Sequence, residues 1–403
     1  MPQHPVSDMI KNAITTPITG DIVRGAIELE STETGTITHR LPDWARAQCL
    51  DPQLAMAEAQ PSGVHLVFRT TATEIALEAV PTKRSYVGMP PRPNGMYDLL
   101  VDGKLVQQAT IDAGHVLHID MTKGTATPQK GAPGFARFTE LPSGPKNIEI
   151  WLPHNETTEL VALHCNAAIE PGRINAPSTP NRRVWLHYGS SISQGSDAAS
   201  PTGTWPAVAA LASNVDLINM GFGGGALLDP FIARTIRNEK ANLISLKIGI
   251  NLVNADIMRL RAFTSAVHGF IDTIRDGHPL TPLLVISPIY CPIHEETPGP
   301  CNFDFAALAN GTLKFQATGD RGETARGKLT LQIIRDELSK IVTQRSSTDT
   351  NLHYLDGQSL YGPADYAHMP LPDELHPDAA THHKIGDRFI ANVFGPNGVF
   401  APS

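Results

Sequence analysis

Two short segments, far apart in the chain, carry residue types that together could activate a hydroxyl group. One reads Gly189-Ser190-Ser191-Ile192-Ser193, and the other, near the C-terminus, reads Asp373-Glu374-Leu375-His376-Pro377. A serine hydroxyl is a weak nucleophile near neutral pH. It needs an imidazole to take its proton and a carboxylate to orient that imidazole. We therefore predict that Ser191 is a nucleophile, that His376 is its general base and that Asp373 holds the imidazole.

Each of these segments also has a plainer interpretation when it is taken alone. Glycines on both sides of Ser191 permit a sharp turn from a strand into a helix, but serines in such turns often serve only as helix caps. If Ser191 is the nucleophile, its own N–H at the helix start would point at a developing oxyanion. Flanking prolines favour a rigid loop around Asp373 and His376, although an Asp-x-x-His spacing is common by chance.

Two segments between these ends are candidates for stabilising an oxyanion. Glycines at 221 and 223–225 follow an apolar strand and would let backbone N–H groups approach a ligand. The same segment also fits the dinucleotide pattern G-x-G-x-x-A, but the next strand ends at Gly249-Ile250-Asn251 without the carboxylate that pattern requires. We therefore expect no nucleotide and no other cofactor. The side chain of Asn251 could donate its amide to an oxyanion or simply form a turn.

Histidines with acidic or histidine neighbours occur at His294-Glu295-Glu296 and at His382-His383. Neither has the i, i+4 histidine spacing of a helical metal site. We expect solvated surface histidines there and no metal.

The pattern of apolar and polar residues differs between the two parts of the chain. Alternating apolar and polar residues punctuated by Gly, Pro and Asp predict antiparallel strands and a β-sandwich in the first part. The strands are expected at 63–70, 73–80, 97–101, 104–106, 147–153 and 158–163, with an Asp-Gly turn at 102–103. Apolar strands alternating with helices after about residue 183 predict a parallel sheet covered on both faces. The predicted domains are a β-sandwich at 1–172, a linker at 173–183 and an α/β domain at 184–403.

Composition restricts the classes of partner. The chain has 403 residues, which favours two domains, and a formal net charge of -8, which argues against nucleic acid. The four cysteines fit no zinc motif. Cys291 and Cys301 lie on the same loop and could pair, but two free thiols are expected. The absence of an apolar run of about 20 residues predicts no membrane span. The sequence as given has no secretion signal and predicts a cytoplasmic protein, while a removed leader would leave secretion open. Oligomeric state cannot be predicted.

The order Ser, Gly, Asn and Asp-x-x-His, each after a strand of an α/β chain, resembles the SGNH (GDSL-type) hydrolase superfamily over about 184–393. The resemblance implies a three-layer α/β/α sandwich with a five-stranded parallel sheet. It also implies that Ser191 is the nucleophile, that Asp373 and His376 complete the triad, and that Gly224 and Asn251 join the Ser191 N–H as oxyanion donors. The family usually has Asp where this chain has Ser190, so how the nucleophile turn is held stays open. A Gly-Ser-Ser-Ile subgroup is the better relative.

The two-part layout of this chain resembles that of family members in which a jelly-roll β-sandwich precedes the hydrolase domain. Some carbohydrate esterases are among them. We expect an esterase that removes an acetyl or other short acyl group through an acyl-enzyme, on a small-molecule or carbohydrate ester. A broad small-acyl esterase or lipase, a thioesterase and an acyltransferase would use the same triad. The alternative from another functional class is a non-catalytic carbohydrate-binding protein. Its support is that Ser190 replaces the Asp that the family usually has.

The segment from Pro288 to about Arg326 shows little periodicity and is rich in Pro, Gly and His. Long loops in compact domains are usually functional or mobile. We expect it to border the site, with Tyr290 and His294 in contact with substrate.

Overall fold

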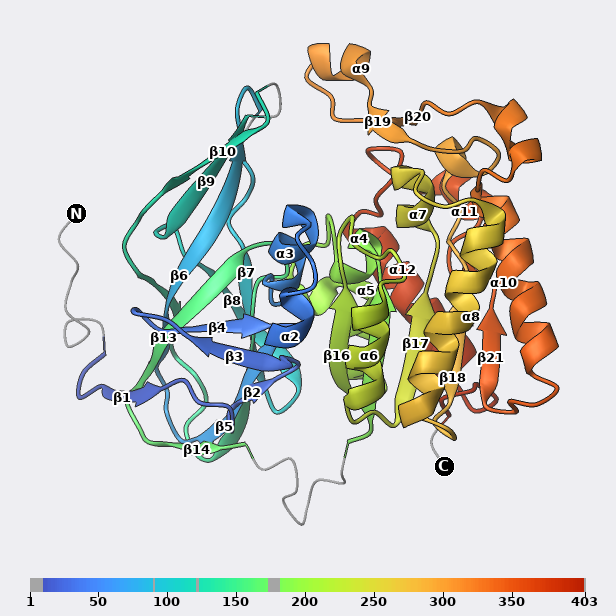
Figure 1. Ribbon diagram of the computed structural model, residues 1–403. Coiled ribbons are helices and arrows are strands. Elements are labelled where there is room, and N and C mark those ends of the chain that lie inside the picture. The colour runs from blue at the N-terminus through green and yellow to red at the C-terminus, as the bar shows by residue number, and fades with distance from the viewer. Residues whose placement is uncertain (1–9, 90, 121–122, 173–181, 402–403) are drawn as a thin grey trace. The chain divides into compact units, whose positions relative to one another are not determined.

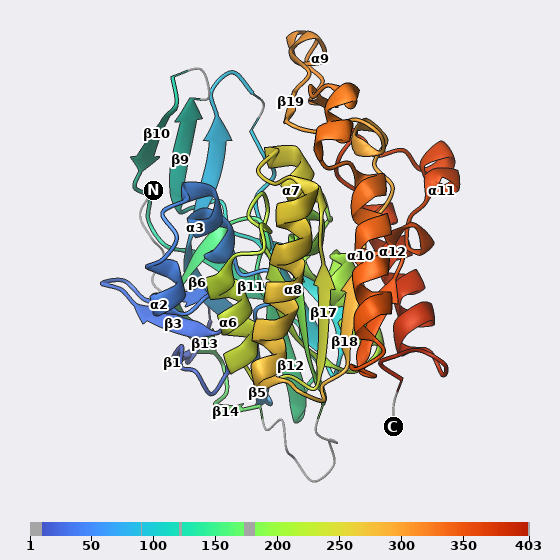
Figure 2. The same cartoon turned by 45° about the vertical axis from the view of Figure 1, so that its right-hand side comes forward.

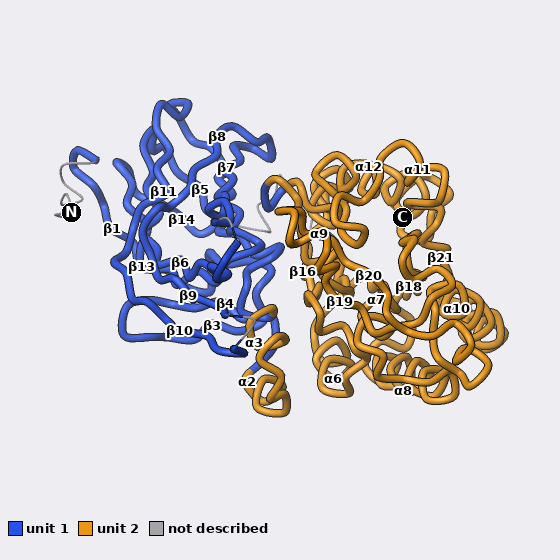
Figure 3. Tube along the Cα trace, turned by 90° about the horizontal axis from the view of Figure 1, so that it is seen from above, with its two compact units in different colours: residues 1–42, 58–182, 200–202 blue, residues 43–57, 183–199, 203–403 orange. Residues whose placement is uncertain are grey.

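The computed structural model describes residues 10–89, 91–120, 123–172 and 182–401. These form two compact units (Figure 3). The first unit comprises 1–42, 58–182 and 200–202, and the second comprises 43–57, 183–199 and 203–403. Residues 43–57 thus group with the second unit although they precede most of the first. The predicted boundaries at 172 and 184 stay predictions, and 173–181 of the predicted linker lie outside the described residues.

The first unit is built from two β-sheets that share one core. Leu77 and Leu163 come from the larger sheet and Phe68 and Ile150 from the smaller, and all four side chains are completely buried. In order, the larger sheet contains β10 (Thr125–Gln129), β9 (His115–Asp120), β6 (Ile75–Tyr86), β13 (Thr157–Cys165), β4 (Thr36–His39) and β3 (Glu28–Ser31), with β1 (Ile14–Pro17) on β13 and β11 (Gly134–Phe138) on β6. The smaller contains β14 (Ile169–Pro171), β5 (His65–Thr70), β12 (Lys146–Trp151), β7 (Met96–Val101) and β8 (Lys104–Thr110), with β2 (Val23–Arg24) on β5. The predicted β-sandwich is confirmed.

The second unit is built on a five-stranded parallel sheet. Its order is β16 (Asp216–Gly221), β15 (Val184–Gly189), β17 (Leu243–Lys247), β18 (Leu283–Ile286) and β21 (Leu352–Leu355). The central strands β17 and β18 are buried along their whole length, as expected for strands covered on both faces. Because the strands are parallel, the loops that follow them all lie at one edge of the sheet, which is where such sheets bind ligands.

Helices cover both faces of this sheet, which confirms the predicted three-layer fold (Figures 1 and 2). One face carries α5 (Trp205–Ala212) and α12 (Ala379–Phe389), and the other carries α6 (Pro230–Asn238), α8 (Leu260–Gly277) and α10 (Leu331–Arg345). Helix α12 continues into a π-helical turn at Ile390–Phe394. Three short helices lie near the loop edge: α4 (Ser191–Gln194), α7 (Ile250–Ala255) and α11 (Pro363–His368). Two more, α2 (Asp43–Arg46) and α3 (Pro52–Glu58), come from the N-terminal part of the chain.

The segment after Pro288, which lacks periodicity, folds into a projecting arm (residues 301–317). It consists of a hairpin of β19 (Cys301–Phe303) and β20 (Phe315–Ala317), with α9 (Phe305–Ala309) between the two strands (Figure 1). Turns of 3-10 helix precede and follow it, at Pro292–His294 and Arg321–Arg326. Cys291 and Cys301 are both free, as expected. Among the described residues, no helix is both long and apolar enough to cross a bilayer.

The loop between α11 and α12 is held at its base by Asp365. The carboxylate of Asp365 is bound by Arg388 through both guanidinium ends, by the ammonium of Lys384 at 2.7 Å and by the backbone N–H of Gly362 at 2.9 Å. Burial alone would raise the pKa of Asp365, but these donors outweigh it and lower that pKa well below its usual range.

We expect Asp365→Asn to reduce the free energy of unfolding by about 2 kcal/mol at pH 7, because charge-assisted hydrogen bonds are lost. A carboxylate with a depressed folded-state pKa stabilises fully above its unfolded pKa, near 3.9, and loses that contribution as pH falls through the folded value. The difference from wild type in urea unfolding should therefore change little down to about pH 4 and shrink as the pH falls from there towards about 2. Asp387→Asn, at an exposed position of α12, serves as the control. A gap that stayed constant over this range would contradict the assignment.

Candidate active site

The nucleophile turn follows β15 directly. Ser190 is the extended N-cap residue of α4, and Ser191 is the first residue of that helix. The Oγ of Ser191 lies 3.0 Å from the Nε2 of His376, although 185 positions separate them in the chain. Ser191 and His376, predicted from separate motifs, are therefore within hydrogen-bond reach.

A buried histidine under the turn holds it in place. The Nε2 of His187 lies 2.8 Å from the Oγ of Ser193, and its Nδ1 lies 2.7 Å from the Oγ of Ser245. Ser245 also accepts the indole N–H of Trp185 at 2.8 Å. Burial lowers the pKa of His187 to about 3, which keeps the ring neutral.

Further contacts tie the turn to the second strand. The side-chain amide of Asn219 donates to the carbonyl of Ser193 at 2.9 Å, and its Oδ1 accepts the N–H of Gly221 at 2.9 Å. A side chain at Gly221 could not fit, because its Cβ would lie 2.4 Å from the backbone nitrogen of Gln194. The turn is thus held by Ser193 and Asn219. By contrast, the Oγ of Ser190 is buried and has no hydrogen-bond partner within the described part of the chain.

The closing loop orients the imidazole. The Oδ2 of Asp373 lies 2.7 Å from the Nδ1 of His376, while its Oδ1 accepts the backbone N–H groups of Leu375 and His376 at 2.9 and 2.6 Å. Burial opposes the charge, yet these donors prevail and the pKa of Asp373 is lowered. A charged Asp373 accepts a hydrogen bond from the Nδ1–H of His376, which leaves the lone pair of Nε2 facing Ser191.

The predicted oxyanion donors come from the loops after β16 and β17. A Cβ on Gly223 would lie 3.5 Å from the Cβ of Ser191, so the glycine loop runs alongside the nucleophile. The N–H of Gly223 is occupied by the Oε1 of Gln194 at 2.7 Å. Among the described residues, no acceptor holds the N–H of Gly224 or that of Ser191.

Asn251 lies in α7, and 3% of it is exposed. Its Oδ1 accepts the N–H of Ala226 at 3.2 Å. This bond connects α7 with the glycine loop and makes Nδ2 the end of the amide that can still donate. That polarity is the one an oxyanion requires.

The arm borders the closing loop. The ring of Phe315 meets the His376 ring edge-on, with 5.7 Å between centroids, and its backbone N–H donates to the carbonyl of Asp373 at 2.9 Å. Glu374, in left-handed conformation with φ 68°, is bound by Lys314 at 2.9 Å and by the hydroxyl of Tyr366 at 2.6 Å. No sequence pattern had indicated Phe315 or Glu374, because their partners come from separate parts of the chain.

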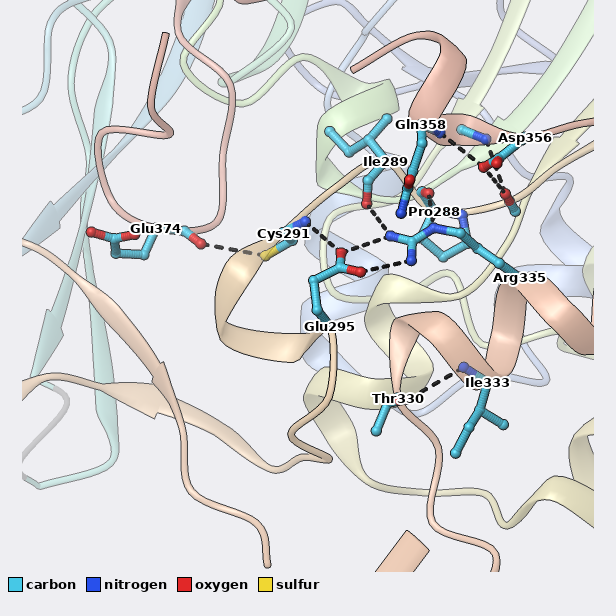
Figure 4. A network of polar contacts seen from close by, with 12 residues as sticks. Pro288, Ile289, Cys291, Glu295, Thr330, Ile333, Arg335, Asp356, Gln358 and Glu374 are labelled. Carbon is cyan, nitrogen blue, oxygen red and sulfur yellow. Dashed lines mark hydrogen bonds and ion pairs between the residues drawn. The ribbon is translucent and has the colours of Figure 1, made fainter. Parts of the chain in front are cut away.

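A buried ion pair supports the other side of this loop (Figure 4). Arg335 of α10 binds Glu295 through two nitrogens at 2.7 Å and also donates to the carbonyls of Pro288 and Ile289. Glu295 in turn accepts the N–H of Cys291 at 2.9 Å, and the thiol of Cys291 contacts the carbonyl of Glu374 at 3.3 Å. Burial raises the pKa of this thiol, so it remains a donor.

Tyr290 and His294, predicted to contact substrate, lie in the segment before the arm. Tyr290 is half-buried, and its ring lies 5.6 Å from the ring of Tyr366, which binds Glu374. His294 is completely buried, with its Nδ1 bonded to the carbonyl of Thr297 at 3.0 Å. Substrate contact by these two residues stays a prediction, and for His294 it would require the loop to open.

The histidines considered above as possible metal ligands were expected to be exposed to solvent, and for two of them this expectation is wrong. His294 and His382 are both completely buried. His382 donates from Nε2 to the carbonyl of Ser196 at 2.9 Å and accepts the N–H of Trp205, and burial lowers its pKa to about 4. Sequence periodicity could not reveal this because the partners lie about 180 residues away. The described residues hold one group of possible metal ligands, Asp197 with Asp373 and His376, and two of its members already bind each other.

Residues 182–292 match the profile of the GDSL-like Lipase/Acylhydrolase family. This segment contains Ser191, Gly224 and Asn251, whereas Asp373 and His376 lie beyond it. Together with the parallel sheet described above, this match shows a GDSL-like lipase/acylhydrolase domain at 182–292 and supports an enzyme that acts on ester bonds.

The chain is similar over nearly its whole length to several solved structures. The salicylyl-acyltransferase SsfX3 of a tetracycline biosynthetic pathway is 26% identical, with a TM-score of 0.75, covering 94% of this chain and 96% of that one. A GDSL-like lipase from Bacteroides ovatus is 18% identical, with a TM-score of 0.65 and coverages of 94% and 97%. An acetyl xylan esterase from Butyrivibrio proteoclasticus is 10% identical, with a TM-score of 0.52 and coverages of 96% and 100%. No curated protein sequence matches the chain.

The contact between Phe315 and His376 leads to a prediction. An aromatic pair contributes about 0.5–1.5 kcal/mol, so Phe315→Ala should lower kcat/KM for p-nitrophenyl acetate by up to about tenfold. The control is Phe305→Ala on the same arm, where the side chain is 69% exposed. Equal activities of the two variants would show that the ring of Phe315 does not support the imidazole.

Proposed function

We propose that the protein is a serine esterase that works through an acyl-enzyme, with Ser191 as nucleophile, His376 as general base and Asp373 as the residue that orients it. The single observation that carries this is the continuous hydrogen-bond chain from the Oγ of Ser191 to Nε2 of His376 at 3.0 Å and from Nδ1 to Asp373 at 2.7 Å. A nucleophile, a base and an orienting carboxylate in this arrangement perform acyl transfer on unrelated folds.

In the first half-reaction, Nε2 of His376 takes the hydroxyl proton as the Oγ of Ser191 forms a bond to the ester carbonyl carbon. The charge on the tetrahedral oxygen is stabilised by the N–H groups of Ser191 and Gly224 and by Nδ2 of Asn251. As the carbon–oxygen bond to the leaving alcohol breaks, His376 returns the proton to that alcohol. In the second half-reaction water attacks the acyl-enzyme, again with His376 as base, and Ser191 is regenerated with release of the acid.

The acyl group we propose is acetyl or another short chain, and the alcohol is a carbohydrate. The support is the likeness of the whole two-unit chain to the acetyl xylan esterase over 96% of its length. The candidate that stands beside it is acyl transfer, supported by the likeness to a salicylyl-acyltransferase. In that case an acceptor hydroxyl replaces water in the second half-reaction. A non-catalytic role is the weaker candidate, because the turn that carries Ser191 is held through Ser193 and needs no contact from Ser190.

Ser191→Ala should reduce the hydrolysis of p-nitrophenyl acetate by about 10³-fold or more and abolish labelling by a fluorophosphonate probe. Asn251→Ala keeps the nucleophile and should still be labelled, while kcat falls about 10²–10³-fold through loss of one oxyanion donor. Circular dichroism checks that both variants are folded. A Ser191→Ala protein with wild-type activity would reject the proposed mechanism.

Substrate class is tested with p-nitrophenyl acetate, butyrate and octanoate, and with acetylated xylan. An acetyl-sized site requires kcat/KM to fall as the acyl chain lengthens and acetate to be released from the xylan. Faster turnover of octanoate would count against it. Adding an alcohol acceptor separates the two half-reactions: if transfer is the function, acylated acceptor should form at the expense of free acid.

A further inference from the structure

One side of the Gly223–Gly224 peptide is held by a residue from the N-terminal part of the chain. The side-chain amide nitrogen of Gln53, in α3, donates to the carbonyl oxygen of Gly223 at 2.8 Å. The contact joins positions 170 residues apart, and both residues belong to the second compact unit. Neither the hydrolase motifs nor the family match at 182–292 includes Gln53.

The start of α3 places Gln53 at this peptide. The Oδ1 of Asp51 accepts the backbone N–H of Gln53 at 2.7 Å, which caps the helix. The next residue, Leu54, is buried, and a Cβ on Gly225 would lie 2.8 Å from its Cδ1. Gln53 itself is exposed and stays close to Gly224, whose Cβ would lie 3.0 Å from its Cγ. The backbone of α3 is therefore fixed on the glycine loop, and the side chain of Gln53 lies over the peptide.

This carbonyl and the N–H of Gly224 belong to the same planar peptide unit. Among the described residues the one cis peptide bond is Gly299–Pro300, so the Gly223–Gly224 bond is trans and its C=O and N–H point in opposite directions. A donor on the oxygen thus fixes the direction of the N–H on the far side of the peptide. It also polarises the unit, which strengthens the N–H as a donor.

Within the loop, the N–H of Gly225 donates to the carbonyl of Phe222 at 3.1 Å. This bond closes a turn around the Gly223–Gly224 peptide but holds neither its C=O nor its N–H. The N–H of Gly223 is already engaged by Gln194 at 2.7 Å, on the preceding peptide unit. Gly224 has a φ of +75°. Glycine adopts this left-handed conformation readily because it has no Cβ, and for the same reason its backbone can rotate more freely than that of other residues. Without Gln53, the Gly223–Gly224 peptide could rotate and turn its N–H away from the nucleophile.

We propose that Gln53 is a positioning residue for the oxyanion hole, which holds the Gly223–Gly224 peptide so that the Gly224 N–H faces the developing oxyanion. The proposal rests on the proposed function, because it presupposes a tetrahedral intermediate at Ser191. It assigns to α3, a helix encoded far upstream of the hydrolase motifs, a direct part in setting the rate of the reaction.

The test uses the full-length chain and compares three variants. Gln53→Met keeps the length of the side chain but removes the donor. It should lower kcat for p-nitrophenyl acetate about tenfold, less than outright loss of an oxyanion donor, with KM changed less than about twofold because the interaction acts on the transition state. Gln53→Lys keeps an N–H donor and should retain kcat within about threefold. Gln48→Met, in the same segment but bonded to Trp44 and Arg234, is the matched control and should behave like wild type.

A second readout is the affinity of phenylboronic acid, which forms a tetrahedral adduct with a catalytic serine. Its inhibition constant should rise in Gln53→Met by the same factor as kcat falls, and remain unchanged in Gln48→Met. Wild-type kcat in Gln53→Met would overturn the proposal, as would equal losses in the Met and Lys variants, which would indicate packing alone. Ser191→Ala separates the two levels: if it retains activity, the proposed mechanism fails, whereas an inactive Ser191→Ala with a fully active Gln53→Met removes only the role of Gln53.

Discussion

The chemistry proposed for this protein depends on a chain of two hydrogen bonds that runs from a hydroxyl through an imidazole to a carboxylate. The geometry is demanding because Ser191 and His376 lie 185 positions apart and meet at 3.0 Å. A parallel sheet, in which each strand end delivers its loop to the same edge, brings such distant residues together. The fold of the second unit is therefore the first requirement of the site.

Support for the site comes from buried polar contacts below it and beside it. Below the nucleophile turn, His187 stays neutral because it is buried, and it connects the turn to the central strands through Ser193 and Ser245. Beside the closing loop, Glu374 receives Lys314 and Tyr366, and the ion pair of Arg335 with Glu295 holds the segment below it. Each of these groups is satisfied by a partner from another element, so the loops that carry the triad are fixed although they have little regular structure.

The arm and α3 show how elements outside the common fold contribute to the same edge. The arm brings Phe315 against the ring of His376. Helix α3 brings Gln53 to the glycine loop. Both are attached to loops that hold the reacting groups, so variation in either segment changes the surroundings of the nucleophile without changing the sheet.

The sequence by itself determined the classes of structure and the candidate reactive residues. Alternation with period two predicted the strands of the sandwich, and apolar strands between helices predicted the parallel sheet. Both patterns are local, because a strand buried on one face alternates apolar and polar residues and a strand buried on both faces is apolar throughout. Ser191, Asp373 and His376 could be named because their motifs are short and contiguous. The tertiary structure alone decided which groups support them. His382 was expected at the surface and is buried, while Gln53, Phe315 and Glu374 acquire their roles from partners up to 170 positions away. Such contacts join residues that are far apart in the sequence and meet only in the folded chain, so no local pattern of residues can predict them.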